Sequence, residues 1–419
     1  MSSTLVPDTE TPAQDSPGIG ESLHNYWDRV RGGDLGSLPA VAGLIALIIV
    51  FTALQGDTFL SAFNFANLIN QSAMIIVLAM GLIFVLLLGE IDLSAGFAAG
   101  TCAAVLGVTL TEKGWPLLLA LAATLLTGVV IGVLIGVLVA KLGIPSFVVT
   151  LAMFLALQGL MLLIIGEGGT IGIDDPAILN IMNANMSPLA GWILFAIVVG
   201  GWALLSLNKM RSRRASGLPT ENMSVFLAKL IALAVILGFV VYILNQERSR
   251  NPAVTSIVGV PYVVPLILIL VVGLTYLLSR TGFGRHVYAV GGNAEASRRA
   301  GISVSRIKIA CFIACSTLAA VAGILFASRD NSISPSTGGS TTLLYAVGAA
   351  VIGGTSLFGG RGRIIDAVIG GLVVGVIANG LPLITQQSGI SFIVTGLVLL
   401  VAASVDALSR RRAMATGRV

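Results

Sequence analysis

Charged residues are scarce in this chain. Of its 419 residues, 24 are lysine or arginine and 19 are aspartate or glutamate, so charged residues make up 10% of the sequence. A soluble globular domain carries about 25% charged residues. Hydrophobic residues make up 56%, and the mean hydropathy is +0.98. This composition excludes a water-soluble exterior and indicates an integral membrane protein.

Cysteine and histidine are also rare. The three cysteines, Cys102, Cys311 and Cys315, lie in apolar stretches without paired spacing, which indicates neither a disulfide framework nor a metal site. The two histidines, His24 and His286, lie outside the apolar stretches. An intramembrane enzyme would need histidine, cysteine or paired acids that converge inside the bilayer. We therefore expect no catalytic site, no metal and no cofactor bound by this chain.

Long apolar runs, separated by glycine, proline and charge, fill most of the sequence. A helix needs about 20 apolar residues to cross a bilayer. The runs predict an all-α polytopic membrane protein with about twelve transmembrane helices, of which several are short. The predicted spans are Pro39–Leu54, Ser72–Leu88, Ala95–Thr111, Pro116–Ala140, Pro145–Ile165, Leu189–Leu207, Val225–Leu244, Pro261–Ser279, Arg306–Ala327, Ser340–Leu357, Ile364–Thr385 and Ile390–Leu408.

The basic residues predict how the chain is oriented. With both termini in the cytoplasm, 20 of the 24 basic residues fall on the cytoplasmic side, which leaves only Lys113, Arg248, Arg250 and Arg329 outside. Lysine and arginine are enriched in cytoplasmic loops. The predicted protein is therefore a multi-pass protein of the plasma membrane, with a cytoplasmic tail over residues 1–38 and a basic cytoplasmic tail over 409–419. The basic excess is a topology signal, and we expect no nucleic-acid partner.

Two acids interrupt the apolar sequence where the second predicted span ends. Glu90 and Asp92 are followed by Ser94 and then by the next apolar run. Acids near membrane-length segments are costly and often functional. One interpretation is that Asp92 or Ser94 caps the following helix. The other is that this break lines a transport path or communicates with a cytoplasmic partner, and the two interpretations can hold together.

The longest polar connection in the C-terminal half contains a short predicted helix. Asn293 is a good N-cap, Glu295 lies in the first turn, Arg298 and Arg299 lie in the last, and Gly301 suits the C′ position. Isolated helices of two turns are marginal in water. This helix therefore either rests on the membrane surface or is received by a cytoplasmic protein, and we favour the second interpretation.

Two kinds of glycine pattern follow. The segment Gly353–Arg363 has glycines at the spacing of a phosphate loop, but Gly360 and Arg361 stand where a lysine followed by serine or threonine is required, so we exclude nucleotide binding by this chain. The series Gly128, Gly132 and Gly136 places small residues four apart, which lets helix backbones approach closely. It predicts a compact helix bundle.

Four segments resemble the permeases of ABC importers of the ribose/xylose/arabinose type. They are Gly89–Gly96, Gly282–Asn293, Ala300–Ile302 and Gly353–Gly362, and the resemblance extends from about residue 54 to 406. It implies a type II-like permease bundle over residues 39–408 that forms a homodimer. It also implies two partners, a cytoplasmic ATPase with fused nucleotide-binding domains that holds the ATP and Mg²⁺, and an extracytoplasmic sugar-binding protein. The chain is then a transport subunit rather than an enzyme.

The resemblance also suggests roles for the segments described above. In a permease of this kind, the loop 280–305 would dock the ATPase, and the two glycine-containing breaks would act as gate or coupling elements. Uncharged polar side chains in the spans suit a neutral substrate that must also leave. The candidates are Asn293, Glu295, Arg298, Arg299 and Gly301 for ATPase docking; Glu90, Asp92, Ser94, Gly353, Gly354 and Thr355 for the gate; Gln71, Gln158 and Asn379 for the substrate path; and Arg329, where relatives also carry arginine, for docking of the binding protein.

An additional hairpin sets the substrate prediction. Ribose-type members resemble this chain with about ten helices, whereas residues 189–246 here add two more. The longer architecture resembles xylose-type permeases, so we predict import of a pentose such as xylose, with other sugars open. An ABC permease for another small polar solute is one alternative. An ion-coupled secondary transporter is less favoured, because Glu90, Asp92 and Asp366 lie at span ends rather than at mid-membrane.

Overall fold

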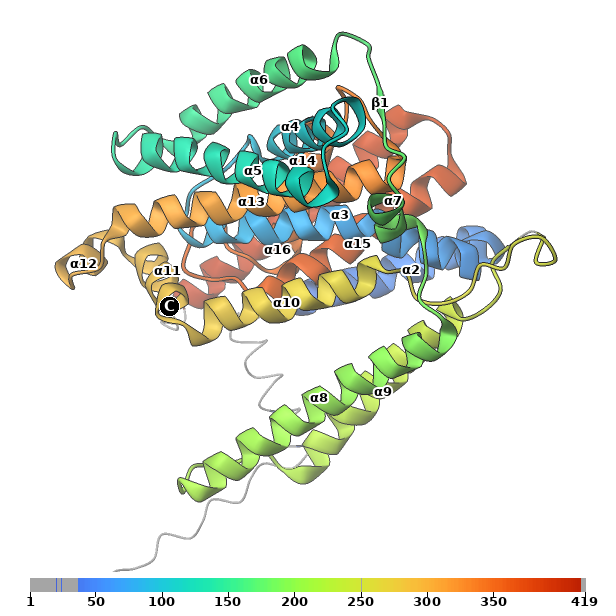
Figure 1. The fold of residues 1–419 in the computed structure, drawn as a ribbon. Helices are drawn as coiled ribbons and strands as arrows, with labels where there is room; N and C mark the ends of the chain where they lie inside the picture. Colours follow the sequence, from blue (N-terminus) through green and yellow to red (C-terminus); the bar gives the residue numbers. More distant parts are fainter. Residues whose placement is uncertain (1–19, 21–23, 25–36, 250, 416–419) are drawn as a thin grey trace, which may run out of the picture.

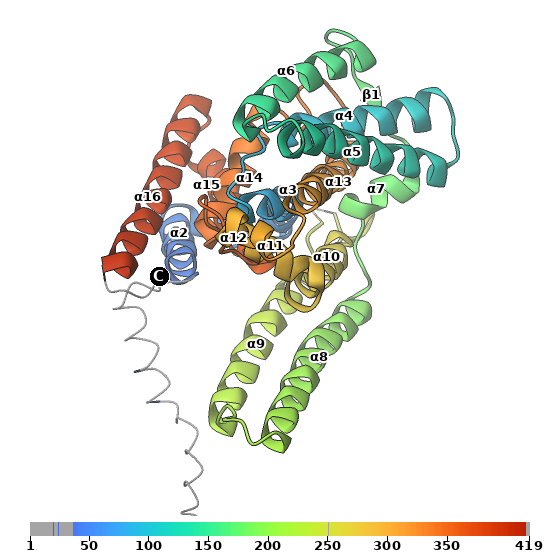
Figure 2. The same cartoon turned by 90° about the vertical axis from the view of Figure 1, so that its left-hand side faces the viewer.

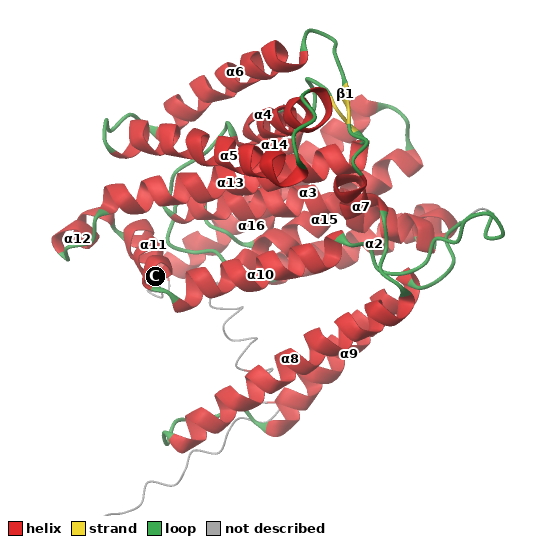
Figure 3. Ribbon diagram, in the orientation of Figure 1, coloured by secondary structure: helices red, strands yellow, loops and turns green. Residues whose placement is uncertain are grey.

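The computed structural model describes residues 20, 24, 37–249 and 251–415. The predicted N-terminal tail lies almost entirely outside the described residues, as do the last four residues of the predicted C-terminal tail. Helices make up most of the described chain, where β-structure is confined to a two-residue ladder and one isolated bridge (Figure 3). In the ladder, Ile171 pairs with Ile333 in antiparallel register.

The bounds of the elements are as follows in chain order: α2 Leu38–Phe59, α3 Ala62–Leu87, α4 Ala95–Gly107 with a π-helical extension Val108–Glu112, α5 Leu117–Ala140, α6 Ser146–Ile165, β1 Ile171–Gly172, α7 Pro176–Asn183, α8 Pro188–Ala215, α9 Met223–Leu244, α10 Val263–Arg280, α11 Gly282–Gly292, α12 Ala294–Arg299, α13 Val304–Asp330, β2 Ser332–Ile333, α14 Ser340–Gly353, α15 Ile364–Ile384 and α16 Ser388–Ala415.

Every predicted span coincides with a helix, which confirms the predicted fold class. Within the described part of the chain, ten helices are long and apolar enough to cross a membrane. Helix α14 has 14 residues and is shorter than predicted, because Gly354 adopts φ +118° and ends it. The apolar part of α16, Ser388–Val398, is also short. The count of twelve spans therefore stays a prediction.

Helix α3 lies at the centre of the bundle. Its residues from Ser72 to Leu87 are all buried. A helix that is hydrophobic on all sides packs on all sides. Helices α13, α5, α4 and α6 lie to one side of α3, and α15, α2 and α16 lie to the other (Figure 2). The centre of the bundle is thus formed by α3 and the helices with which it makes its most extensive contacts, α13, α14 and α15.

Helices α8 and α9 form a hairpin that diverges from the bundle (Figure 1). In an apolar stretch of 18 residues, only 6% of the residues of α8 and 11% of those of α9 are buried. The hairpin is joined to the bundle near one end, where Val241 and Leu244 pack with Ala66 and Val260. Its other end carries the basic turn that includes Arg213. The exposed apolar sides of this hairpin suit contact with lipid chains.

Glycine allows α5 to contact α13 backbone to backbone. A Cβ atom at Gly132 would lie 2.5 Å from the Cα of Ile313, and one at Gly128 would lie 2.6 Å from the carbonyl oxygen of Ser316. Gly136 meets Ile309 in the same way, at 2.8 Å. The predicted small-residue packing is confirmed at this interface.

We expect Gly132→Ala to destabilise the protein, because α5 and α13 must separate to admit the methyl group. Overpacking of this kind costs about 1–3 kcal/mol. Gly200→Ala is the matched control, since no atom lies within 4 Å of a Cβ there. Alanine in an exposed helix is favoured over glycine by about 0.5–1 kcal/mol. Thermal unfolding in detergent should therefore shift down for Gly132→Ala and not for Gly200→Ala; equal shifts would contradict the packing role.

Candidate functional site

Three segments meet in backbone contact where α3 ends. The N–H of Gly360 donates to the carbonyl of Leu87 at 2.9 Å. A Cβ atom at Gly291, in the last turn of α11, would lie 1.8 Å from that same carbonyl oxygen. A Cβ atom at Gly359 would lie 2.9 Å from the nitrogen of Gly89 and 2.8 Å from the oxygen of Gly291. We call this contact of α3, α11 and the α14–α15 loop the glycine junction; a side chain at these positions would push the segments apart.

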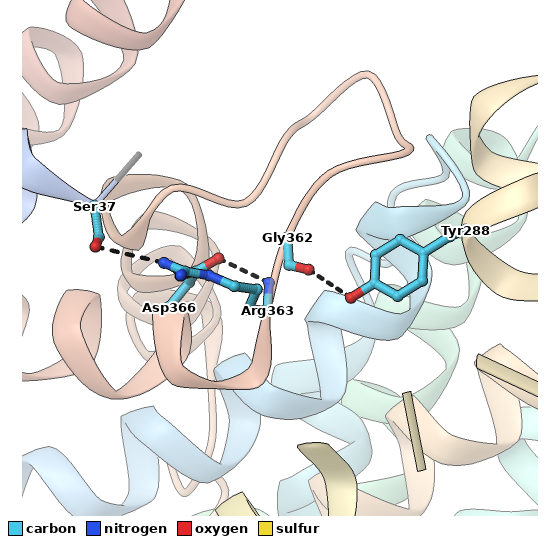
Figure 4. Close-up of polar contacts among 5 residues, drawn as sticks. All are labelled: Ser37, Tyr288, Gly362, Arg363 and Asp366. Atoms are coloured by element: carbon cyan, nitrogen blue, oxygen red, sulfur yellow. Dashed lines mark hydrogen bonds and ion pairs between the residues drawn. The ribbon is translucent and has the colours of Figure 1, made fainter. Parts of the chain in front are cut away.

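Side chains beside the glycine junction hold the loop onto α11 and α15 (Figure 4). The Tyr288 hydroxyl on α11 donates to the carbonyl of Gly362 at 2.7 Å. Arg363 donates from its backbone N–H and its guanidinium to Asp366, at 2.7 and 2.9 Å, and its guanidinium also reaches the Ser37 hydroxyl at 3.4 Å. Burial, followed by the nearby charge of Asp366, raises the pKa of Tyr288. The phenol therefore stays protonated and keeps donating at neutral pH.

The gate candidates Gly353, Gly354 and Thr355 form the turn that ends α14. A Cβ atom at Gly353 would lie 1.8 Å from the carbonyl oxygen of Asp366 in the first turn of α15. Thr355 is fully buried, and its N–H donates to the carbonyl of Ala350 at 3.0 Å. The turn is therefore packed tightly on α15 and continues into the loop that reaches the glycine junction.

Asp92 is buried just beyond the glycine junction, with 1% of its surface exposed. Its Oδ1 atom accepts hydrogen bonds from the N–H of Ser94 at 2.9 Å and from the Ser94 hydroxyl at 2.6 Å. The Ser94 side chain makes no capping hydrogen bond at the start of α4. Of the two capping residues considered, only Asp92 therefore accepts an N–H at this helix start.

Glu90 forms an ion pair with Lys308 near the start of α13. The pair is largely shielded, with the two side chains 16% and 23% exposed. It ties the α3–α4 connection to α13 across 218 positions of sequence. Sequence analysis missed this pair, because a lysine in the first turns of a helix carries no local sign of a partner so distant.

The short helix predicted after Asn293 is confirmed as α12. The Asn293 side chain accepts the N–H of Ala296 at 2.8 Å, and Glu295 pairs with Arg298 at 3.0 Å and with Arg299 at 3.3 Å. The Glu295, Arg298 and Arg299 side chains are 57%, 66% and 80% exposed. The helix thus presents charged groups at one end of the bundle, where a partner can contact them.

A cavity of about 400 Å³ lies where the chain leaves the C-terminal end of this helix. It is lined by Gly301, where φ is +85°, by Ser303 and Arg306 from the segment leading into α13, and by His286 from α11. Helix α11 was not predicted, although the Thr281 hydroxyl before it accepts the N–H of Gly284 at 3.3 Å in the manner of an N-cap. Because only Asn293 separates α11 from α12, the exposed helix leads directly to the glycine junction.

The three substrate-path candidates are not brought together. Asn379 on α15 forms a reciprocal amide pair with Asn64 on α3, with hydrogen bonds of 2.8 and 3.0 Å. Gln71 lies on α3, whereas Gln158 lies on α6, on the other side of α3 from α15 (Figure 2). The side-chain amide of Asn379 is therefore already hydrogen-bonded within the chain, to Asn64.

The end of the bundle away from α12 holds Arg329 and an ordered loop after α9. Arg329 is partly buried in the last turn of α13. In the loop, Glu247 accepts the Ser256 hydroxyl and the N–H groups of Ile257 and Ser249, which lower its pKa to about 2. Arg248 donates to the carbonyls of Leu244 and Gly259, at 2.6 and 3.0 Å. Glu247 thus stays ionised through the physiological range and organises the loop; no sequence motif marked it.

Comparison with known proteins defines the class. Residues 64–403 match the family described as "Branched-chain amino acid transport system / permease component". The match covers most of the chain, so the protein belongs to this family of permeases.

The relatives include the xylose transport system permease protein XylH of Escherichia coli K12, which is 35% identical over 372 residues, covering 89% of this chain and 92% of the relative. The Haemophilus influenzae XylH is 34% identical over 88% of this chain and 95% of its own. The ribose import permease protein RbsC of Escherichia coli K12 is 31% identical over 88% of this chain and 92% of its own. The resemblance inferred from the sequence is confirmed. No solved structure matches the chain.

Proposed function

We propose that this chain is the transmembrane permease subunit of an ABC importer that moves a sugar, a pentose such as xylose, across the cytoplasmic membrane by alternating access. The xylose and ribose permeases among its relatives support a sugar. The glycine junction carries the mechanical part of the proposal, because it brings α11, which only Asn293 separates from the exposed helix α12, into close backbone contact with the end of α3.

In this mechanism, α12 docks on a separate cytoplasmic ATPase that binds ATP and Mg²⁺. Movement of α12 passes through α11 to the glycine junction, since rigid backbone contact transmits a displacement without first compressing side chains. The junction then acts on Glu90, Asp92 and Ser94 on one side, and through the α14–α15 loop on Gly353–Thr355 on the other. Both groups lie at interfaces that can adopt two arrangements, which a gate requires.

The orientation follows from the distribution of charge. Helix α12, the turn between α8 and α9, and the loop before α15 lie at the same end of alternating helices, and all carry basic residues. Basic loops favour the cytoplasm, so we place this end and both termini there. An extracytoplasmic sugar-binding protein would then contact the end with Arg329, and two permease copies would form the homodimer.

Salt dependence of binding-protein association in an Arg329→Glu variant checks that contact, because a surface charge pair weakens as salt rises.

Two alternatives are distinguished by energy source and substrate. A permease for another small polar solute would use the same coupling. A secondary transporter would instead need an ion gradient and no ATPase, and its coupling carboxylates would lie near the midplane. Glu90 instead pairs with Lys308 near the start of α13, which is not the midplane position of a coupling carboxylate. This position favours the ATPase-coupled alternative.

The proposed function predicts ATP-dependent sugar uptake by a reconstituted complex. Proteoliposomes containing this permease, its ATPase and its binding protein should accumulate labelled D-xylose or another pentose when ATP is enclosed on the ATPase side. Collapse of proton and sodium gradients should leave uptake intact. Uptake that requires a gradient and proceeds without ATP would reject the proposal, and ATP-driven uptake restricted to a solute other than sugar would select the other permease alternative.

Variants of the docking helix should uncouple transport. Proline cannot adopt the φ of +85° found at Gly301, and Arg298→Glu reverses an exposed charge on α12. Each should reduce uptake and co-purification with the ATPase in parallel, while membrane insertion is retained. Arg213→Glu, at the basic turn of the α8–α9 hairpin, is the control and should leave both unchanged. Normal association in both α12 variants would exclude docking by this helix.

Charge reversal should test the pair that holds the gate. Surface pairs contribute up to about 1 kcal/mol, and breaking a buried pair costs about 3–5 kcal/mol; this shielded pair lies between these limits. Glu90→Lys should therefore reduce coupled uptake by about tenfold, the effect of about 1.4 kcal/mol, and Glu90→Lys with Lys308→Glu should restore most of it. Glu221→Lys breaks the more exposed pair with Lys229 and serves as control. No loss in Glu90→Lys, or no recovery in the double variant, would contradict the role.

A further inference from the structure

A cavity of about 260 Å³ lies at the end of the bundle away from α12, between α14, α15 and the start of α16. Tyr345 contributes to it from α14, and Gln386, Ser388, Ser391 and Phe392 contribute from the segment that leaves α15 and enters α16. None of the substrate-path candidates identified from the sequence lines it. In the proposed orientation this end faces the binding protein, so the cavity lies on the side from which substrate arrives.

We propose that this cavity is the outer sugar-binding site of the transport path. The proposal rests on the proposed function for its direction of transport. Its lining matches the chemistry of a neutral polyol, because it combines two aromatic side chains with several hydroxyl groups and an amide, and contains no charged residue. Ligand sites typically pair aromatic and apolar walls with a few placed polar groups. Such sites hold about 300–1,000 Å³ for drug-sized ligands, so the smaller volume here suits a monosaccharide.

Four polar side chains in the cavity are available, whereas the Thr385 and Thr395 hydroxyls are hydrogen-bonded within the protein. Among the residues that the structure describes, the Tyr345 hydroxyl, the Gln386 amide and the Ser388 and Ser391 hydroxyls make no hydrogen bond to another protein group. A glutamine amide both donates and accepts, and so does a serine hydroxyl. A sugar hydroxyl needs both kinds of partner, and these groups can supply them from α14, from α16 and from the connection before α16.

A proline adds a backbone acceptor to the same wall. Pro382 lies inside α15, and it has no N–H with which to satisfy the carbonyl four residues earlier. That carbonyl belongs to Ala378, and both Ala378 and Pro382 line the cavity. The carbonyl of Ala378 thus lacks its helical donor at a point where a ligand hydroxyl can donate to it. An interior proline would otherwise only weaken the helix.

Uptake by the reconstituted complex tests the site. At saturating sugar-loaded binding protein, we expect Gln386→Ala and Phe392→Leu to reduce D-xylose uptake at least fivefold, with unchanged ATPase association. Phe392→Tyr should retain most activity, because the aromatic face is kept. Gln387→Ala is the matched control, since Gln387 is adjacent in sequence but does not line the cavity. Gln386→Ala should also change the ratio of D-xylose to D-ribose uptake, which a loss of stability alone would not do.

Chemical labelling tests occupancy independently of transport. A Ser391→Cys variant of the complex should react with a thiol reagent from outside, and millimolar D-xylose should slow the reaction several-fold, whereas glycine betaine at equal osmolarity should not. Normal uptake and an unchanged sugar ratio in Gln386→Ala and Phe392→Leu, or labelling that D-xylose does not slow, would overturn this site while wild-type uptake upholds the proposed function. Absence of sugar uptake by the wild-type complex would instead reject the function itself.

Discussion

At the end of α3, the carbonyl oxygen of Leu87 accepts the N–H of Gly360 while the Cα of Gly291 lies close against it. Three polypeptide segments can meet there only because two of them lack side chains at the point of contact. The arrangement determines where α11 ends, how the α14–α15 loop runs and where the chain turns toward α4. The ion pair of Glu90 with Lys308 and the buried Asp92 lie just beyond it, so their positions depend on this contact.

The loss of hydration explains why the acidic residues beside the glycine junction are paired or hydrogen-bonded. An ion pair that is taken out of water must offset the loss of hydration, and the Glu90–Lys308 pair reduces that loss by lying partly exposed near the start of α13. The α8–α9 hairpin shows the opposite solution, since few of its apolar residues are buried and its charged residues gather in the turn and in the adjoining ends of the two helices. One part of the chain is therefore built for protein contacts and the other for lipid.

Local signals in the sequence predicted local structure well. The cap at Asn293, the charges of α12 and Gly301 all act within one or two turns, and the structure shows each of them as predicted. The Glu90–Lys308 pair could not be predicted, because it depends on how α3 and α13 pack. Asn379 shows the same limit. A polar residue in an apolar span was a reasonable path candidate, but its partner Asn64 lies 315 positions away. Helices that are apolar on all sides give no periodicity from which to tell the path from the core.

Helix α14 connects the two regions to which we assign function. Its 14 residues span about 20 Å at the rise of an α-helix. Tyr345 near its start lines the proposed sugar site, and Gly353 at its end is packed on the first turn of α15. Helix α15 also takes part at both ends, through Asp366 and through Pro382. Because two adjacent helices each contact both regions, a displacement of the α14–α15 loop must move the walls of the cavity. In the proposed mechanism, this geometry lets movement that begins at α12 change how tightly the outer site holds its sugar.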